Sequence, residues 1–391
     1  MNTFIQELQR RTPLGWLQLS YHKNRFLVAL SGIAFADVLM FMQLGFQNAL
    51  YDSNTRLNRA LLADIVLISP QSRNMQNLAT FSRRRLLQAE DIPGVKSAAP
   101  MYIGLITWKN PQTRRKTSVQ ALGFNPEQPA LNIPEVNNQL DKIKLPDHFV
   151  FDRAARGEYN EAFSQIDAGQ TVTTEVDKRT ISISGLFKLG ASFGADGTLV
   201  SSDENFLRLF PRRQPGSINL GLVNVQQGYE PKQVAEALKS HLPDDVKVLT
   251  LAEYVKFEED YWKKESPIGF IFSLGVSMGF MVGVIIVYQV LSTDVNAHIK
   301  EYATFKAMGY GNSYLLGVIF EEALILAVLG FIPGFIVPLG LYRLAANATN
   351  LPVYMTVFRA LIVLLLTLIM CILSGTIATR RLQSADPADM F

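Results

Sequence analysis

From Pro267 to Thr293 the chain contains 27 consecutive residues without a charge. A helix of about 20 apolar residues crosses a hydrocarbon core roughly 30 Å thick, so this run predicts a membrane-spanning helix. Ala323 to Tyr342 and Ala360 to Thr379 are two further uncharged runs of 20 residues each. A fourth run, Phe26 to Tyr51, is interrupted only by Asp37. The sequence therefore predicts a membrane protein with four transmembrane α-helices.

The segment between the first and second spans, residues 47–266, has the composition of a water-soluble domain. It holds 27 of the 37 Lys and Arg residues and 26 of the 34 Asp and Glu residues. A strand–helix–strand pattern lies near each of its ends, at 64–108 and at 218–250, which predicts an α+β domain split by a second subdomain. Helical periodicity at 48–62 and 251–265 predicts stalk helices that lead out of the membrane.

These patterns divide the chain into nine segments. We expect an interfacial N-terminal helix at 1–25, spans at 26–46, 267–293, 313–342 and 357–379, the large domain at 47–266, a coupling helix at 294–312, a short periplasmic loop at 343–356 and a tail at 380–391. Ala34-Phe35-Ala36 has the form of a signal-peptidase site, but the apolar run continues beyond it, which favours an uncleaved anchor.

The distribution of basic residues predicts the orientation. Eight Lys and Arg residues lie in the N-terminal flank, in the loop between the second and third spans and in the tail, against two between the third and fourth spans. Short basic loops stay in the cytoplasm, so we expect both termini to be cytoplasmic in a multi-pass protein of the inner (plasma) membrane. The large domain then lies outside the cytoplasm, in the periplasm where one exists.

Several function classes are excluded or disfavoured by what the sequence lacks. A net charge of +3 argues against a nucleic-acid binder, and the single cysteine, Cys371, excludes an internal disulfide and a cysteine zinc cluster. The four histidines are too far apart for a metal site. No Gly-Lys pair occurs, so the chain has no phosphate loop and cannot bind ATP by that route. We therefore expect no metal and no directly bound cofactor.

Three glycines at intervals of four, Gly275, Gly279 and Gly283, form one stripe on the second span. Gly275 to Gly279 also satisfies the GxSxG pattern of hydrolases, but that motif requires a strand-to-helix turn, and here it lies inside an apolar helix. The stripe is better interpreted as a surface that lets another helix approach closely.

Three acidic residues lie in or beside the spans. Asp37 stands near the middle of the first span, where a carboxylate must face protein or water, either as a substrate or gating contact or as a packing residue. Glu321 and Glu322 are adjacent, so they point about 100° apart on a helix and cannot share one face. We expect these two at the cytoplasmic interface.

The stretch from Asp294 to Met308 predicts an amphipathic helix between the second and third spans. Its apolar face is formed by Val295, Ile299, Tyr302 and Phe305, and Glu301 and Lys306 contribute charge. We expect Asp294 to cap its start and Gly309 its end. Such a helix either lies in the lipid interface or acts as a lever against a cytoplasmic partner.

This layout resembles the MacB-like, FtsX-domain class of ABC transporter permeases over the whole chain. Glu301, Ala307 and Gly309 are similar to the Glu-Ile-Gly…Ala-x-Gly pattern of that family, from which Tyr302 and Ala303 depart. The segments Ile319 to Gly340 and Asp386-Pro387-Ala388 are similar to its third span and its tail. More narrowly, Gly32 to Phe46 and the C-terminal residues resemble the DevC permeases of heterocyst glycolipid exporters.

The resemblance implies a homodimeric permease that is itself non-catalytic and binds a separate ABC ATPase, through which ATP acts. A periplasmic adaptor (membrane-fusion) protein and a TolC-like outer-membrane channel would complete a tripartite pump that exports a glycolipid or another amphiphile. Such pumps work by mechanotransmission, because ATP-driven closure in the cytoplasm is relayed through the spans to the periplasmic domains. The alternative is an FtsX-like, non-transporting signal relay that regulates periplasmic cell-wall hydrolases.

Overall fold

The computed structural model describes residues 14–21, 23–177 and 179–383. The chain forms two compact units. The membrane unit comprises residues 1–47, 270–345 and 353–391, and the large domain comprises residues 48–269 and 346–352. The first 13 residues of the expected N-terminal helix and the tail segment Asp386–Ala388 lie outside the described residues.

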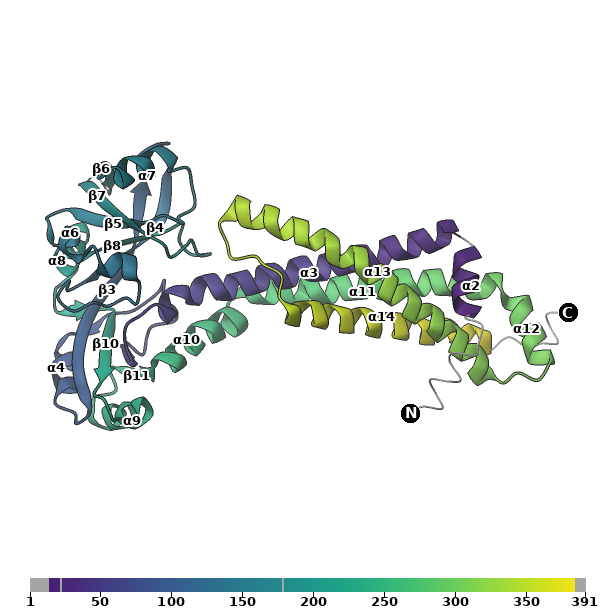
Figure 1. The fold of residues 1–391 in the computed structure, drawn as a ribbon. Coiled ribbons are helices and arrows are strands. Elements are labelled where there is room, and N and C mark those ends of the chain that lie inside the picture. The colour runs from purple at the N-terminus through teal and green to yellow at the C-terminus, as the bar shows by residue number, and fades with distance from the viewer. Residues whose placement is uncertain (1–13, 22, 178, 384–391) are drawn as a thin grey trace. The chain divides into compact units, whose positions relative to one another are not determined.

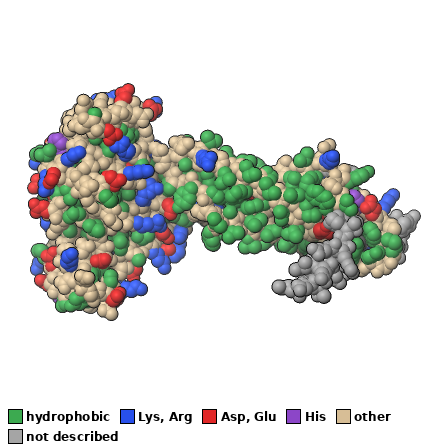
Figure 2. All heavy atoms as spheres, viewed as in Figure 1, with side chains coloured by type: hydrophobic (Ala, Val, Ile, Leu, Met, Phe, Trp, Pro, Cys, Tyr) green, Lys and Arg blue, Asp and Glu red, His purple; other side chains and the backbone are tan. Residues whose placement is uncertain are grey.

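The membrane unit is built from long helices that run alongside one another (Figure 1). In chain order the helices are α2 Leu14–Tyr21, α3 Lys23–Arg59, α11 Pro267–Ala297, α12 Ile299–Ala307, α13 Asn312–Thr349 and α14 Val357–Gln383. Four of these helices, α3, α11, α13 and α14, are long and apolar enough to cross a membrane. Figure 2 shows apolar side chains covering the visible face of this unit.

All four of these helices extend beyond the expected span boundaries, α11 through Ala297 and α14 through Gln383. We expected the third span to end at Tyr342 and a loop to follow, but α13 continues to Thr349. Residues 343–349 contain no proline or glycine, so nothing interrupts the helix before Asn350, which has a φ of 52°. Similarly, α3 is one unbroken helix that includes both the first span and the expected stalk.

The large domain contains a nine-stranded mixed sheet in the order β11-β1-β10-β3-β4-β8-β5-β7-β6. Its strands are β1 Ile65–Ile68, β3 Val95–Lys109, β4 Lys116–Phe124, β5 His148–Asp152, β6 Val172–Val176, β7 Arg179–Phe187, β8 Thr198–Ser202, β10 Leu220–Val225 and β11 Lys247–Thr250. A separate two-stranded sheet pairs β2 Phe81–Ser82 with β9 Ser217–Ile218. The helices are α4 Arg84–Glu90, α5 Pro134–Asn137, α6 Leu140–Lys144, α7 Asn160–Asp167, α8 Asp203–Leu209, α9 Pro231–His241, α10 Leu251–Asp260 and the π-helix η1 Tyr261–Glu265.

The expected division into two subdomains is replaced by one continuous sheet. The 15-residue strand β3 joins its two halves, since Met101 pairs with Leu220 of β10 on one side and with Phe124 of β4 on the other. The strands β11, β1 and β10 come from the two ends of the domain sequence, whereas β4 to β8 come from the insertion between them. A strand of this length can serve both halves because each half pairs with a different part of it.

Both faces of the sheet are covered. In β1, Ile65 and Leu67 enter one apolar core, while Val66 and Ile68 enter the core on the opposite face. Successive side chains of a strand point to opposite faces, so an uninterrupted apolar strand is expected where both faces are buried. The second core also contains Tyr254 of α10, which attaches that helix to the sheet.

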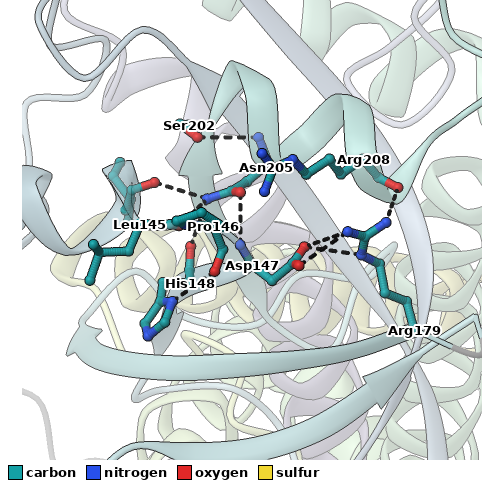
Figure 3. A network of polar contacts seen from close by, with 9 residues as sticks. Leu145, Pro146, Asp147, His148, Arg179, Ser202, Asn205 and Arg208 are labelled. Atoms are coloured by element: carbon teal, nitrogen blue, oxygen red, sulfur yellow. Dashed lines mark hydrogen bonds and ion pairs between the residues drawn. The ribbon is translucent and has the colours of Figure 1, made fainter.

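A polar network fixes the loop that leads into β5 (Figure 3). The Asn205 amide nitrogen donates to the carbonyl oxygens of Leu145 and His148 at 2.8 and 3.3 Å, and its Oδ1 accepts from the Asp147 amide at 2.9 Å. Arg179 forms a bidentate ion pair with the Asp147 carboxylate. The backbone of Asp147 is in the left-handed conformation, with a φ of 58°. These bonds satisfy backbone groups that the loop would otherwise bury without partners.

Candidate functional site

The helix expected to couple to a partner is α12, and it starts later than we expected. The preceding helix α11 continues through Asp294 to Ala297, and His298 is the N-cap residue of α12, without a side-chain capping bond. The expected cap at Asp294 is therefore wrong, because no residue between 294 and 297 interrupts the hydrogen bonds of α11. The end agrees with expectation, since Gly309 follows α12 in the left-handed conformation with a φ of 95°.

The apolar face of this region is divided between the protein interior and the surface. Val295 and Tyr302 are buried in a cluster with Ile319 of α13, and Ile299 and Phe305 pack partly buried against it. These residues therefore anchor α12 within the chain. A partner would meet mainly the outward side of α12.

The outward side of α12 is polar around its centre and apolar at its end. Glu301 and Thr304 are exposed, Lys306 is half-buried, and Met308 and Tyr310 expose 61% and 45% of their surface. The Phe305 ring lies edge-on to the Tyr310 ring, with centroids 5.7 Å apart, which supports this end. The surface therefore combines a carboxylate with two exposed apolar side chains, a combination that suits a protein contact.

Three buried titratable side chains meet where α11, α12 and α13 come together. Glu322 is fully buried beside the Asp294 carboxyl, and neither of its carboxylate oxygens has a hydrogen-bond partner among the described residues. Tyr302 donates to Oε1 of Gln18 in α2 at 3.2 Å. Burial, followed by the charges of Glu322 and Asp294, raises the pKa of Tyr302, so its phenol stays protonated.

Glu321 and Glu322 occupy different environments, as their angular separation requires. Glu321 is half-buried, whereas Glu322 faces the protein interior rather than the interface at which we expected both. A Cβ on Gly15 of α2 would lie 3.0 Å from the Cγ of Glu322, so α2 packs closely over the Glu322 side chain.

Asp37 lies inside the membrane unit with no exposed surface. The Thr367 hydroxyl of α14 donates to its Oδ1 at 2.6 Å, while its Oδ2 has no partner within residues 14–21, 23–177 and 179–383. Gly334 of α13 lies directly against it, because a Cβ there would come within 2.8 Å of Oδ2. Among the described residues, Asp37 of α3 therefore contacts two other helices, α13 and α14, and accepts one side-chain hydrogen bond.

The glycine stripe of α11 packs against α3 of the same chain. A Cβ at Gly275 would lie 2.4 Å from Cδ of Gln43, and one at Gly279 would lie 3.2 Å from Cγ of Met40. At Gly283 it would lie 2.9 Å from the Ala36 Cβ and still closer to a methionine of α14. The stripe thus brings the two helices together, most tightly at Gly275 and Gly283.

Sequence reasoning missed a buried carboxylate in the large domain, Glu258 of α10. It accepts hydrogen bonds from the Met75 backbone amide and from Nε1 of Trp262, both at 2.8 Å, and Asn58 of α3 lies beside it. Burial raises the pKa of Glu258 to about 7, outweighing these hydrogen bonds. The sequence carries a signal for this cluster, since Tyr254, Glu258 and Trp262 recur every fourth residue and so share one helix face.

The last four residues of α13 and the three residues that follow them, 346–352, belong to the large domain. Arg156 donates from Nε to the Thr349 carbonyl at 2.9 Å and from Nη1 to the Asp196 carboxylate at 2.7 Å. The Asn350 amide donates to the Ala155 carbonyl at 3.3 Å. Specific hydrogen bonds thus hold the end of α13 and the residue that follows it.

Comparison with protein families assigns the C-terminal part of the chain. Residues 273–387 match the FtsX-like permease C-terminal family. The match includes most of α11 and all of α12, α13 and α14. The FtsX-like permease domain supports the broad expectation of a permease, whereas the narrower resemblance to DevC stays a prediction. No curated protein matches the chain.

Three solved structures are similar to part of the chain. The periplasmic region of MacB from Actinobacillus actinomycetemcomitans is 14% identical, with 50% of this chain and 92% of that chain covered and a TM-score of 0.33. The extracellular domain of the noncanonic ABC-type transporter YknZ from Gram-positive bacteria is 11% identical, with 48% of this chain and 99% of that chain covered and a TM-score of 0.30. A domain of a putative permease protein from Porphyromonas gingivalis is 13% identical, with 49% of this chain and 88% of that chain covered and a TM-score of 0.28. The assignment rests on the family match, because TM-scores this low do not establish a common fold.

Proposed function

We propose that the chain is the permease subunit of an ATP-driven ABC exporter that works by mechanotransmission. A separate ATPase would bind the outward side of α12 and move the membrane helices, and these helices would in turn move the large domain. The family match over the region that contains α12 supports this proposal. The observation that carries the relay is the continuity of α3.

The helix α3 is longer than a membrane span. Its 37 residues extend about 55 Å, compared with a hydrocarbon core of roughly 30 Å. Its last turns are anchored in the large domain, since Arg56 donates to the Leu189 carbonyl at 2.6 Å and Arg59 pairs with Glu259 at 3.1 Å. A displacement of α3 would therefore act directly on these two contacts.

The proposed assembly is a homodimer with the ATPase, a periplasmic adaptor and a TolC-like outer-membrane channel, and its proposed cargo is a glycolipid or another amphiphile. The FtsX-like domain is equally compatible with a non-transporting relay that regulates cell-wall hydrolases. Affinity purification of the tagged chain after cross-linking in cells distinguishes the two. Recovery of an adaptor and an outer-membrane channel supports export, whereas recovery of a periplasmic hydrolase activator supports the relay. A lipidomic comparison of a deletion strain then tests the cargo.

The proposal places the large domain outside the cytoplasm, and labelling of single cysteines tests this orientation. Leu131 is buried, so the exposed neighbour Gln128 is the better labelling position. In a chain whose Cys371 is replaced by Ser, Gln128→Cys should react with a membrane-impermeant maleimide in cells whose inner membrane is intact. Reaction only after permeabilisation of that membrane would reverse the proposed orientation.

A further inference from the structure

A groove lies between α3 and α11 at the end of the membrane unit where α3 begins. The space that it offers is about 750 Å³, part of it open to the surroundings, and its lining residues are Asn24, Arg25, Val28, Ile286, Gln289, Val290 and Thr293. No Asp or Glu is among these described lining residues. All of them belong to the membrane unit.

The groove lies one turn away from a close contact between the two helices. Beside it the helices touch closely, since a Cβ on Gly32 would lie 2.3 Å from Cγ2 of Ile286. One turn closer to the start of α3, Val28 takes the place of a glycine and faces Gln289 and Val290. Side chains of this size hold the helix axes apart and leave space between them.

The lining is divided by polarity along the helices. Val28, Ile286 and Val290 provide an apolar floor on the side toward the middle of the spans. Asn24, Arg25 and Thr293 lie at the opposite end, at the first turn of α3. This end carries the positive pole of the α3 dipole in addition to the guanidinium, which favours an anion.

Aromatic residues of α2 mark the depth of this end in the bilayer. Trp16 and Tyr21 expose 42% and 79% of their surface, and the Trp16 ring packs edge-on against Phe26 of α3, with centroids 6.1 Å apart. Exposed tryptophan and tyrosine gather at the level of the lipid headgroups. Arg25 is adjacent to Phe26 and therefore lies at headgroup depth.

We infer that this groove binds one anionic phospholipid, with the phosphate on Arg25 and an acyl chain along Val28, Ile286 and Val290. A phospholipid matches both parts of the lining, because it joins an anion to a hydrocarbon chain in the order that the groove presents them. The lipid comes from the leaflet that faces the start of α3. This site is independent of whether the chain exports a substrate or relays a signal.

The test is native mass spectrometry of the purified full-length chain, delipidated and then titrated with phosphatidylglycerol or phosphatidylcholine. We expect one phosphatidylglycerol to bind about fivefold more weakly to Arg25→Gln than to the wild type, because one basic residue near a membrane surface contributes about 1 kcal/mol. Arg25→Lys should retain most of the binding. Lys23→Gln, which removes the same charge from a residue outside the groove lining, should bind as the wild type does.

A second variant tests the acyl part of the site without changing charge. Val28→Trp fills the groove and should lose the same phosphatidylglycerol while the chain remains inserted and monodisperse. The inference is overturned if Arg25→Gln and Val28→Trp both bind phosphatidylglycerol like the wild type, or if phosphatidylcholine binds equally well. It is also overturned if Val28→Cys cross-links to Val290→Cys of a second copy, since a second chain would then occupy the groove.

Discussion

Buried carboxylates accept more hydrogen bonds in the large domain than in the membrane unit. In the large domain Asp152 accepts three backbone amide hydrogen bonds, from Ala154, Leu189 and Gly190, at 2.7–3.0 Å. In the membrane unit Asp37 accepts one hydrogen bond, and Glu322 accepts none among the described residues. A satisfied buried carboxylate stabilises the structure around it, whereas an unsatisfied one costs free energy and is retained for another reason. The difference suggests structural roles in the domain and functional roles in the membrane unit.

Replacement of Asp152 by leucine should have the largest effect on stability. Three buried amide groups would lose their acceptor, so we expect the free energy of unfolding of the domain to fall by about 3–5 kcal/mol. Trp108 and Trp262 both belong to the domain, and their fluorescence during denaturant unfolding of the full chain measures the change. Asp167→Leu is the control, because Asp167 is an exposed partner of Arg153. Equal midpoints for the two variants would contradict the structural role of Asp152.

The second prediction concerns pH and Glu258. Because burial raises its pKa to about 7 from an ordinary value of 4.5, the folded state favours the protonated form. The free energy of unfolding should therefore be highest below pH 4.5 and decrease as pH rises through 7, by roughly 3 kcal/mol in total. Glu258→Gln mimics the protonated form and should remove most of this decrease in melting curves recorded from pH 5 to 8.5. A wild-type melting temperature that stays constant over this range would refute the assignment.

Substitutions in the glycine stripe should lower stability by a smaller amount. Gly283→Leu should destabilise the contact between α3 and α11 by about 1–3 kcal/mol, because the added side chain overpacks the space taken by Ala36. Gly279→Leu should cost less stability than Gly283→Leu, since Gly279 has a looser contact with Met40, and both variants should still insert. The temperatures at which the detergent-solubilised variants aggregate show which of the two substitutions costs more stability. A reversed order would mean that the stripe packs differently.

Replacement of Asp37 by leucine should cause the smallest loss of stability and a clear loss of function. Replacement of a buried charge by an apolar residue is often neutral or stabilising, so Asp37→Leu should unfold no more readily than the wild type. We expect it to lose export, whereas Asp37→Asn, which keeps an acceptor for Thr367, should retain part of the activity. If Asp37→Leu exports normally, Asp37 is a packing residue and the comparison between the units fails.

The same contrast explains which features could be predicted from sequence. The backbone hydrogen bonds of a membrane helix are local, so uncharged runs were sufficient to locate α3, α11, α13 and α14. In the domain, the strand–helix–strand pattern predicted at 218–250 is observed as β10, α9 and β11, because the periodicity of each of these segments is local too. The single continuous sheet was not predicted, since β5 pairs with β7 and β8, and β3 pairs with both β10 and β4, which are strands distant in sequence or beyond the reach of local periodicity.

The sites follow the same rule. The order of α11, α12 and α13 was readable from spacing, but the burial of Glu322 depends on where α11 ends. An extension of that helix by one turn moves Asp294 from an exposed cap to the interior. The groove beside Arg25 was also unpredictable, because it depends on the way two helices diverge. Tertiary packing, rather than local preference, determines these features.

The most direct test of the relay is the effect of charge reversal on α12. Glu301→Lys changes an exposed residue of this helix, and Glu127→Lys makes the same change on the exposed surface of the large domain. Both variants would be purified with the partner ATPase, and retention of the ATPase and export would be measured together. We expect Glu301→Lys to bind the ATPase about tenfold more weakly and to lose export, because a reversed charge opposes the complementary surface, while Glu127→Lys behaves as the wild type. Normal ATPase binding and export by Glu301→Lys would contradict the proposal that force enters the permease through α12.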